Sequence, residues 1–344
     1  MLFDEIDSFH FVGVGGVGMS AIAYILLKKG CRVSGSDLHA SEVTARLANS
    51  GATIFLGHAA ANLTDVKAIV VSSAIRTENP EVLEAQRRGL PIFHRSDLLA
   101  ALLNGCDGIA VAGSHGKTTT TSMIAFLLER AGKDPHVLIG GDLDAIGGNA
   151  KVGSSSWMVA EADESDGSFL KFLPQIAVVT NIENDHLDHY GSEAEIYRAF
   201  VQFVNQVKPG GAAVIGIDSA AVRTLAAQAG NHCITYAVDQ VADFTARQLV
   251  SQGMETSFEV YRYGESLGTM RISVPGRHNV MNCLACVVVG MQLGVAFEQI
   301  AAIMPGFGGV KRRFQTKGRA HGIWVVDDYG HHPTEILTTV YGAK

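Results

Sequence analysis

Apolar positions in the first hundred residues fall into short runs that alternate with stretches of helical spacing. Residues 9–14 form an apolar run that ends in glycine, and 69–71 form another run of the kind found in buried strands. Between them, 19–29 carries apolar side chains three and four positions apart, with a glycine where a helix C-cap belongs. This alternation predicts a parallel sheet with helices on both faces.

A second series of strands and helices begins near Asp107. Residues 256–274 alternate around a Tyr-Gly-Glu turn, which predicts an antiparallel pair of strands. Helical spacing predicts one helix that ends near Arg130, another at 279–293, and the start of a third at Pro333. The remaining strands that the pattern predicts are 109–112, 157–160, 176–180, 212–215 and 322–328.

The composition narrows the class of protein. Of 344 residues, 47% are hydrophobic and 18% are charged, which is typical of a globular chain. The net charge of -7 supplies no basic face for nucleic acid. Five scattered cysteines argue against a disulfide framework and for a reducing compartment. With no apolar run of about 18 residues and an acidic start unlike a signal peptide, we expect a cytoplasmic protein without stable membrane association.

A glycine-rich sequence follows the first predicted strand. Residues 13–18 fit G-x-G-x-x-G between a strand and a helix, and Asp37 follows about 20 residues later. The glycines allow backbone N–H groups to approach a diphosphate at the start of the helix. The motif therefore predicts a dinucleotide or nucleotide-diphosphate site, and it does not distinguish NAD from a UDP-sugar. The alternative is a glycine-rich turn that binds nothing.

A second loop at 113–120 has the sequence Gly-Ser-His-Gly-Lys-Thr-Thr-Thr. In a phosphate-binding loop of this kind, Lys117 would reach the β- and γ-phosphates and the Thr118 hydroxyl would bind Mg²⁺. The loop departs from the full G-x-x-x-x-G-K-[ST] spacing, because residue 111 is valine. A chance Gly-Lys-Thr is the alternative, and the flanking strand and helix make it the weaker one.

Acidic residues follow the strand predicted at 157–160. Acids at the carboxyl end of a parallel strand are well placed for Mg²⁺, although a solvated acidic loop is the alternative. A histidine after the next strand, His186, could join a metal site or be structural. The acids are Glu161, Asp163, Glu164 and Asp166.

Two further patterns favour structural interpretations. Cys283 and Cys286 have metal-ligand spacing but lie in an apolar helix without a second pair, which favours core packing. His331 and His332 are adjacent and would not share a helix face, which argues against a metal pair. Two phosphate-type loops suggest an enzyme with two substrates. A kinase, an NAD enzyme with an ATPase domain and an ATP-dependent ligase remain open on the residues alone.

Taken together, the motifs resemble the Mur ligase family of peptidoglycan synthesis over essentially the whole chain. The family also uses the shorter form of the second loop, with threonine commoner where this chain has Ser114. The segments that carry the resemblance are 10–20, 34–37, 113–120, 161–166, 181–188, 275–279, 310–314 and 327–335.

The resemblance implies an α/β protein with three domains. These are a Rossmann-like UDP-sugar-binding domain at 1–104 and a central P-loop-type mononucleotide-binding α/β domain for ATP at 105–310. The start of a third, Rossmann-like, amino-acid-binding domain follows at 311–344. On this resemblance the third domain is incomplete in the chain as given.

The resemblance also implies an activity. The most similar family members use ATP and Mg²⁺ to join L-alanine to the lactyl carboxylate of UDP-N-acetylmuramate through an acyl-phosphate. A ligase of the same family that recycles murein tripeptide is the alternative, and an NAD-dependent oxidoreductase is a weaker one. Neither the oligomeric state nor the choice among L-alanine, serine and glycine follows from the sequence.

Roles carry over from the family to matching positions of this chain. The resemblance implies that Lys117, Glu161 and His186 are catalytic, and that Thr118, Glu161, Glu164 and His186 bind metal. The implied ATP-binding residues are Gly113, Ser114, His115, Gly116, Lys117, Thr118, Thr119, Asn279, Asn282, Arg313, Asp327 and His331. The implied UDP-sugar-binding residues are Gly13, Gly15, Gly16, Val17, Gly18, Asp37, Ser72, Ser73 and Asn149.

Overall fold

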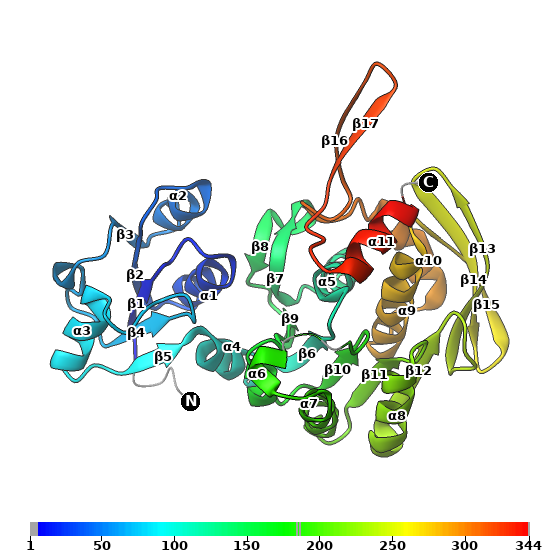
Figure 1. Cartoon of the computed structure of the whole chain (residues 1–344), viewed down its shortest axis with the longest axis horizontal. Coiled ribbons are helices and arrows are strands. Elements are labelled where there is room, and N and C mark those ends of the chain that lie inside the picture. Colours follow the sequence, from blue (N-terminus) through cyan, green and yellow to red (C-terminus); the bar gives the residue numbers. More distant parts are fainter. Residues whose placement is uncertain (1–5, 184, 186, 343–344) are drawn as a thin grey trace.

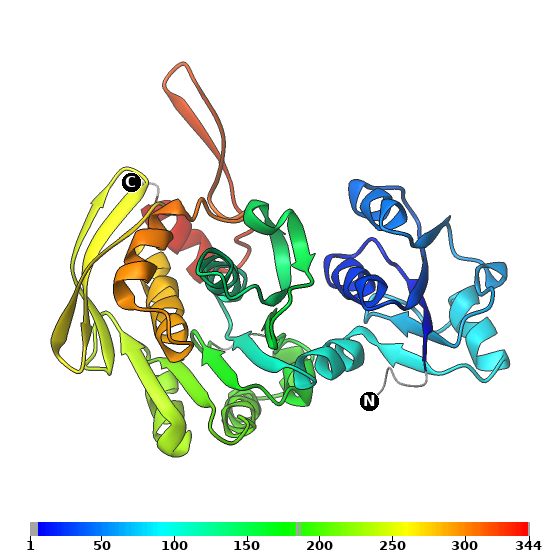
Figure 2. The same cartoon turned by 180° about the vertical axis from the view of Figure 1, so that it is seen from behind.

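The computed structural model describes residues 6–183, 185 and 187–342 of the chain. Within these residues the strands form three separate sheets, of five, ten and two strands, in chain order. Figure 1 shows the first sheet and its helices on one side of the molecule and the large second sheet on the other, with the two-stranded hairpin projecting above. The view from behind shows the same arrangement (Figure 2).

The first sheet is parallel throughout and has the order β3-β2-β1-β4-β5. Its reversal of strand order at β1 places the carboxyl ends of β1 and β4 at a switch point, where ligands bind in open α/β sheets. The strands are β1 (Ser8–Val12), β2 (Arg32–Asp37), β3 (Thr53–Leu56), β4 (Ala68–Val71) and β5 (Ile92–His94). The helices are α1 (Val17–Lys28), α2 (Glu42–Asn49), α3 (Pro80–Arg87) and α4 (Arg95–Asn104), and the 3₁₀ turn η1 is Ala60–Asn62.

The second sheet has the order β15-β14-β13-β12-β11-β10-β6-β9-β7-β8, with β8, β14 and β15 antiparallel to their neighbours. The strands are β6 (Asp107–Ala112), β7 (His136–Leu143), β8 (Gly148–Lys151), β9 (Trp157–Glu161), β10 (Ile176–Val179), β11 (Ala212–Gly216), β12 (Cys233–Ala237), β13 (Phe244–Gln252), β14 (Glu255–Arg262) and β15 (Glu265–Ile272). The helices are α5 (Lys117–Arg130), α6 (Leu187–Tyr190), α7 (Glu193–Asn205), α8 (Ala220–Gln228), α9 (Arg277–Gln292) and α10 (Phe297–Ile303). The 3₁₀ turns are η2 (Asp144–Ile146), η3 (Ser168–Lys171), η4 (Gly230–His232) and η5 (Met304–Gly306).

The central strand β6 shows why the second sheet is covered on both faces. Ile109 and Val111 point into a core formed with α5 and α9, whereas Ala110 and Ala112 point into the core on the opposite face. Successive side chains of a strand alternate between faces, so a run without polar residues requires cover on both. Cys283 and Cys286 of α9 lie fully buried in the first of these cores, which confirms their packing role.

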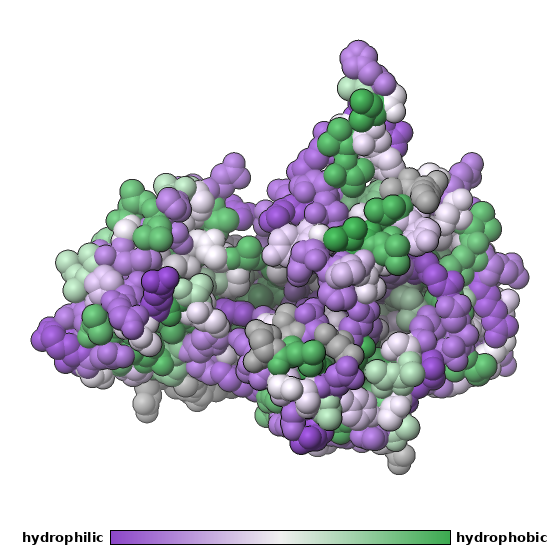
Figure 3. Space-filling view, in the orientation of Figure 1, coloured by the Kyte–Doolittle hydropathy of each residue, from purple (hydrophilic) through white to green (hydrophobic). Residues whose placement is uncertain are grey.

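The chain after residue 310 differs from the single strand that the pattern predicts. The strand predicted at 322–328 is β17 (Ile323–Asp327), but it pairs antiparallel with β16 (Gln315–Ala320), which the pattern missed. The polar sequence of β16 has no run of apolar residues to mark it. Ile323 and Val325 are 65% and 52% exposed, and Figure 3 shows hydrophobic residues along this hairpin. The helix α11 (Pro333–Gly342) follows and begins at the predicted proline.

Polar contacts join the first sheet's domain to the second. Arg95 at the start of α4 donates to Asp163 at 2.9 Å, and Lys171 pairs with Asp97 at 2.6 Å. Asn149 of β8 donates to the carbonyl oxygen of Val17 at 2.8 Å. None of the described helices has the length and apolar character of a membrane span.

Candidate active site

The loop between β6 and α5 can exist only with glycine at two positions. Gly113 has φ +134°, and a Cβ there would lie 2.2 Å from the Thr180 hydroxyl. Gly116 has φ +83°, and a Cβ there would lie 2.8 Å from an Asn282 oxygen. The left-handed backbone and these close approaches both exclude a side chain. The loop thus brings its backbone against β10 and α9, next to the N-terminus of α5, where phosphate groups bind.

Lys117, the first residue of α5, is held inside this loop. Its ammonium group donates to the carbonyl oxygens of Gly113 at 2.6 Å and Ser114 at 3.3 Å, and it pairs with a Glu164 oxygen at 2.6 Å. Glu164 is only 2% exposed, and burial raises the pKa of its carboxyl. The lysine is therefore in place at the phosphate loop, with Glu164 as its counterion.

Thr118 and Glu161 place oxygen ligands together beside the loop. The Thr118 hydroxyl donates to Glu161 at 3.3 Å, and the Gly140 N–H donates to the other carboxylate oxygen at 2.7 Å. Burial raises the pKa of the Glu161 carboxyl, and the hydrogen bond from Gly140 opposes that effect. A hydroxyl and a carboxylate at the end of a parallel strand are ligands that Mg²⁺ accepts.

The four acids after β9 do not form one cluster. Asp163 pairs with Arg95 and accepts hydrogen bonds from Ser165, and Asp166 accepts one from the Ser168 N–H. Each therefore stabilises the turn or the contact with the first domain. Glu164 pairs with Lys117, so Glu161 is the acid of this segment next to Thr118. His186 lies outside the described residues.

A cavity of about 280 Å³ opens beside the loop, between α9, β11 and the segment that leads to α11. Asn279 and Asn282 line it, are each 5% exposed, and hydrogen bond to each other at 3.2 Å. His278 also lines it, and burial lowers the pKa of its imidazole to about 4. On its α9 side the cavity therefore offers neutral hydrogen-bonding groups that suit a purine base.

The other residues implied for ATP divide into two groups. His115, Gly116, Thr119 and Arg313 line the same cavity, and Arg313 donates to the Thr118 hydroxyl at 3.4 Å. Asp327 does not line it, because it sits in the hairpin 3.4 Å from Lys317, and the next residue, Asp328, takes the place in the wall. His331 is also outside the wall, with a side chain 70% exposed.

The glycine loop of the first domain follows β1. The N–H groups of Gly13 and Val14 both donate to the Ser36 carbonyl oxygen at 2.9 Å. The Gly15 N–H donates to Asp37 at 2.8 Å, and a Cβ on Gly15 would lie 2.8 Å from that carboxylate. The sequence motif thus folds as expected at the end of β1, with Asp37 bonded to the loop itself.

A model of the Mur ligase family catalytic domain matches residues 8–106, and a model of the Mur ligase middle domain matches residues 111–290. A protein of Syntrophotalea carbinolica named UDP-N-acetylmuramate--L-alanine ligase is 51% identical over 99% of this chain and 75% of its own length. The chain belongs to the Mur ligase family.

Other proteins that resemble this chain support its assignment to the Mur ligase family. A protein of the same name from Geobacter sulfurreducens is 48% identical over the whole chain and 74% of its own length. The crystal structure of UDP-N-acetylmuramate-alanine ligase MurC from Thermotoga maritima aligns with a TM-score of 0.87 at 33% identity, over 98% of this chain and 77% of that one. A murein peptide ligase from Psychrobacter arcticus aligns with a TM-score of 0.83 at 28% identity, over 98% and 76%.

Beneath the glycine loop of this Mur ligase lies a buried network that the sequence pattern does not reveal. Glu81 is 0% exposed and accepts hydrogen bonds from Ser36 at 2.6 Å and Asn62 at 2.6 Å, with His10 3.4 Å away. Burial raises the pKa of the Glu81 carboxyl, but these hydrogen bonds outweigh it and lower the pKa to about 2. Glu81 thereby fixes the end of β2 that carries Asp37. In the sequence Glu81 is only a glutamate after the proline that begins a helix, so nothing there predicts that it supports the glycine loop.

The remaining residues implied for the UDP-sugar lie at the same edge of the first sheet or across from it. Ser72 and Ser73 follow β4, and the Ser73 hydroxyl bonds to His94 at 3.2 Å. Gly16, Val17 and Gly18 form the start of α1, where Asn149 of the second domain reaches the Val17 carbonyl. Asn149 is 9% exposed, so it is a contact between domains in this structure.

Proposed function

We propose that the protein is an ATP-dependent ligase that joins L-alanine to the lactyl carboxylate of UDP-N-acetylmuramate in peptidoglycan precursor synthesis. The observation that carries this proposal is the similarity over the whole chain to relatives named for that reaction. The two phosphate-type loops supply one site for each nucleotide substrate. A carboxylate is a poor acyl donor, so ATP would supply the phosphoryl group that converts it to an acyl-phosphate.

We assign the ATP chemistry to the loop at 113–118. Lys117 lies where its charge would stabilise a transferring phosphoryl group, which is the main contribution of a protein to such a reaction. Thr118 and Glu161 fit Mg²⁺ because both offer oxygen atoms, 3.3 Å apart, in a partly buried position. Mg²⁺ held there would neutralise phosphate charge. Asn279 and Asn282 would orient the base in the neighbouring cavity, and Arg313 would add a positive charge near the phosphates.

We assign the sugar nucleotide to the glycine loop at 13–18. Its backbone N–H groups and the start of α1 suit a diphosphate, and Asp37 would position the loop through Gly15. Ser72 and Ser73, at the end of the neighbouring parallel strand, would line the same cleft. None of these contacts requires the bound nucleotide to be NAD.

We place this activity in the cytoplasm. The described structure contains five free cysteines, none in a disulfide, which suits a reducing compartment. ATP and nucleotide sugars are cytoplasmic substrates, so the reaction and the thiols point to the same compartment.

The test is an assay of ADP, phosphate and amide product with the purified protein. Turnover is expected only when UDP-N-acetylmuramate, ATP, Mg²⁺ and L-alanine are all present, with slower reaction for serine and glycine. Faster turnover with the murein tripeptide than with L-alanine would assign the protein to the recycling branch of the family. Reduction of NAD without ADP formation would overturn the ligase assignment.

A further inference from the structure

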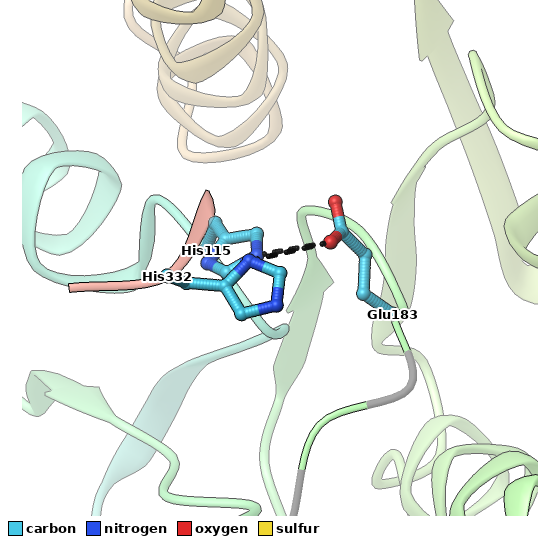
Figure 4. Close-up of side chains that lie close together, drawn as sticks. All are labelled: His115, Glu183 and His332. Carbon is cyan, nitrogen blue, oxygen red and sulfur yellow. Dashed lines mark ion pairs between the residues drawn. The ribbon is translucent and has the colours of Figure 1, made fainter. Parts of the chain in front are cut away.

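Two histidines and a glutamate from three distant segments meet beside the ATP loop. His115 comes from that loop, Glu183 follows β10, and His332 immediately precedes α11. Figure 4 shows the three side chains turned toward one another. One possible ligand atom from each lies within 4.8 Å of the other two, and no other such group occurs in the part of the chain that the structure describes.

The imidazole of His115 is arranged as in many metal sites. Its Nδ1 lies 3.2 Å from a Glu335 oxygen, and its Nε2 is buried, makes no hydrogen bond, and faces Glu183 at 3.2 Å. A carboxylate that binds one ring N–H fixes the tautomer and leaves the other nitrogen free to donate its electron pair to a cation. Glu335 is therefore placed to orient His115 without contacting the cation itself.

The other two side chains converge on the same point. His332 Nδ1 lies 3.8 Å from the Glu183 oxygen that faces His115, and the two imidazole rings are 4.8 Å apart at 34°. Thr334 holds both partners, since its hydroxyl donates to Glu183 at 3.0 Å and its N–H approaches His332 Nδ1 at 3.4 Å. A cation bound to His332 Nδ1 would replace the long contact from the Thr334 N–H.

The spacing suits a small cation of the late first transition series. Ligand atoms about 2.0–2.1 Å from tetrahedral zinc lie roughly 3.4 Å apart, and the two contacts to Glu183, 3.2 and 3.8 Å, lie on either side of that value. Two imidazoles and one carboxylate are a set that zinc and cobalt accept, whereas Mg²⁺ prefers oxygen ligands. With neutral imidazoles, Glu183 and Glu335 also leave two negative charges for a divalent cation to balance.

We propose that His115, Glu183 and His332 form a binding site for a divalent cation of the zinc class, separate from the Mg²⁺ ligands Thr118 and Glu161. The cation would tie the ATP loop to the segment that begins α11. His115, Glu183 and Glu335 also line the purine cavity, so the bound cation would fix one wall of that cavity.

The test is a titration of the nucleotide-free protein with Co²⁺, followed by its visible d–d absorption. One equivalent is expected to bind, to be displaced by Zn²⁺, and to remain in place in millimolar Mg²⁺. His115→Ala, His332→Ala and Glu183→Gln should each weaken binding more than about a hundredfold. Glu335→Gln, which keeps all three ligands, should weaken it about tenfold, as loss of an orienting partner does.

His331→Ala is the matched control, because His331 is adjacent in sequence but 70% exposed and outside the cluster. Its affinity for Co²⁺ should stay within about twofold of the parent. Melting curves identify any variant that fails to fold, and Glu183→Gln is nearly isosteric. Unchanged Co²⁺ binding in folded Glu183→Gln and His332→Ala would overturn the proposal, as would equal loss in His331→Ala or displacement by Mg²⁺.

Discussion

Replacing Lys117 with alanine would separate the chemistry of the ATP loop from its stability. The substitution removes the ammonium group that pairs with Glu164 at 2.6 Å and bonds to the carbonyl oxygens of Gly113 and Ser114. Two effects follow. The transition state loses a positive charge at the phosphoryl group, and the folded state loses the counterion of a buried carboxyl.

The stability effect follows from the burial of Glu164. Breaking a buried ion pair by removing one partner costs about 3–5 kcal/mol, and we expect the lower end because the carboxyl can take up a proton. Burial already raises the pKa of Glu164 above its unfolded value. An acid with a raised folded pKa destabilises the protein increasingly as pH rises above the unfolded pKa, so the deficit should be smallest in acid. A loss of about 3 kcal/mol should lower Tm by roughly 6–12 °C for a domain of this size.

The catalytic effect is expected to be of similar size but independent. Loss of one preorganised electrostatic contact to the transition state costs roughly 3 kcal/mol or more, a factor of about a hundred in turnover. Binding of UDP-N-acetylmuramate should be unchanged, because the glycine loop proposed to bind it lies in the first domain, whereas Lys117 bonds to Gly113, Ser114 and Glu164 of the second.

The double variant Lys117→Ala with Glu164→Gln distinguishes the two effects. Glutamine removes the uncompensated charge, so most of the lost Tm should return while turnover stays low. The assays are product formation, calorimetric binding of the sugar nucleotide, and melting at pH 6 and pH 8. Turnover of Lys117→Ala within about tenfold of the parent would refute the catalytic role. Recovery of turnover in the double variant would show that Lys117 acts only through the fold.

Three further results are expected. Gly113→Ala should destabilise the protein by well over 1 kcal/mol and abolish ATP binding, because its φ is +134° and a Cβ would meet the Thr180 hydroxyl at 2.2 Å; melting and nucleotide titration check this. Glu81→Gln should flatten the loss of stability on acidification. The parent Glu81 has a pKa lowered from 4.5 to about 2, so it contributes about 3 kcal/mol above pH 4.5 that is lost toward pH 2, as acid-unfolding curves would show. UDP-N-acetylmuramate at 100 times its Kd should stabilise the protein by about 2.7 kcal/mol and NAD should not, and a Tm shift with NAD alone would contradict the site assignment.

Sequence patterns predicted where both glycine-rich loops join a strand to a helix, because those loops depend on local rules. Positive φ at Gly113 and Gly116 and the close approach at Gly15 each demand glycine, and glycine at fixed spacing between a strand and a helix is visible in a single chain. The buried strands were visible for the same reason, since both faces of β6 are apolar. Such features are set by neighbours in the chain.

Features that depend on contacts between residues far apart in the sequence could not be predicted from it. The resemblance implies that Glu164 binds metal, but nothing in the sequence predicts that Glu164 pairs with Lys117, as it does in the folded loop. Adjacent in the sequence, His331 and His332 cannot act as a metal pair with each other. The fold instead brings His332 alone to His115 and Glu183. These two residues precede it in the sequence by 217 (332 − 115) and 149 (332 − 183) positions. β16 was missed because its pairing with β17, not its composition, makes it a strand.

One arginine shows how the fold relates the two nucleotide sites. Arg95 begins α4 in the first domain, and its guanidinium pairs with Asp163, two residues beyond Glu161, at 2.9 Å. The same side chain lies 3.5 Å from the position that a Cβ on Gly18 would take, at the end of the sugar-nucleotide loop. Arg95 thus pairs with the segment that carries the proposed Mg²⁺ ligand Glu161 and lies close to the end of the proposed sugar-nucleotide loop. Because a misplacement of about 1 Å can cost a hundredfold in rate, the contact between the domains is as much a part of the proposed reaction as either loop.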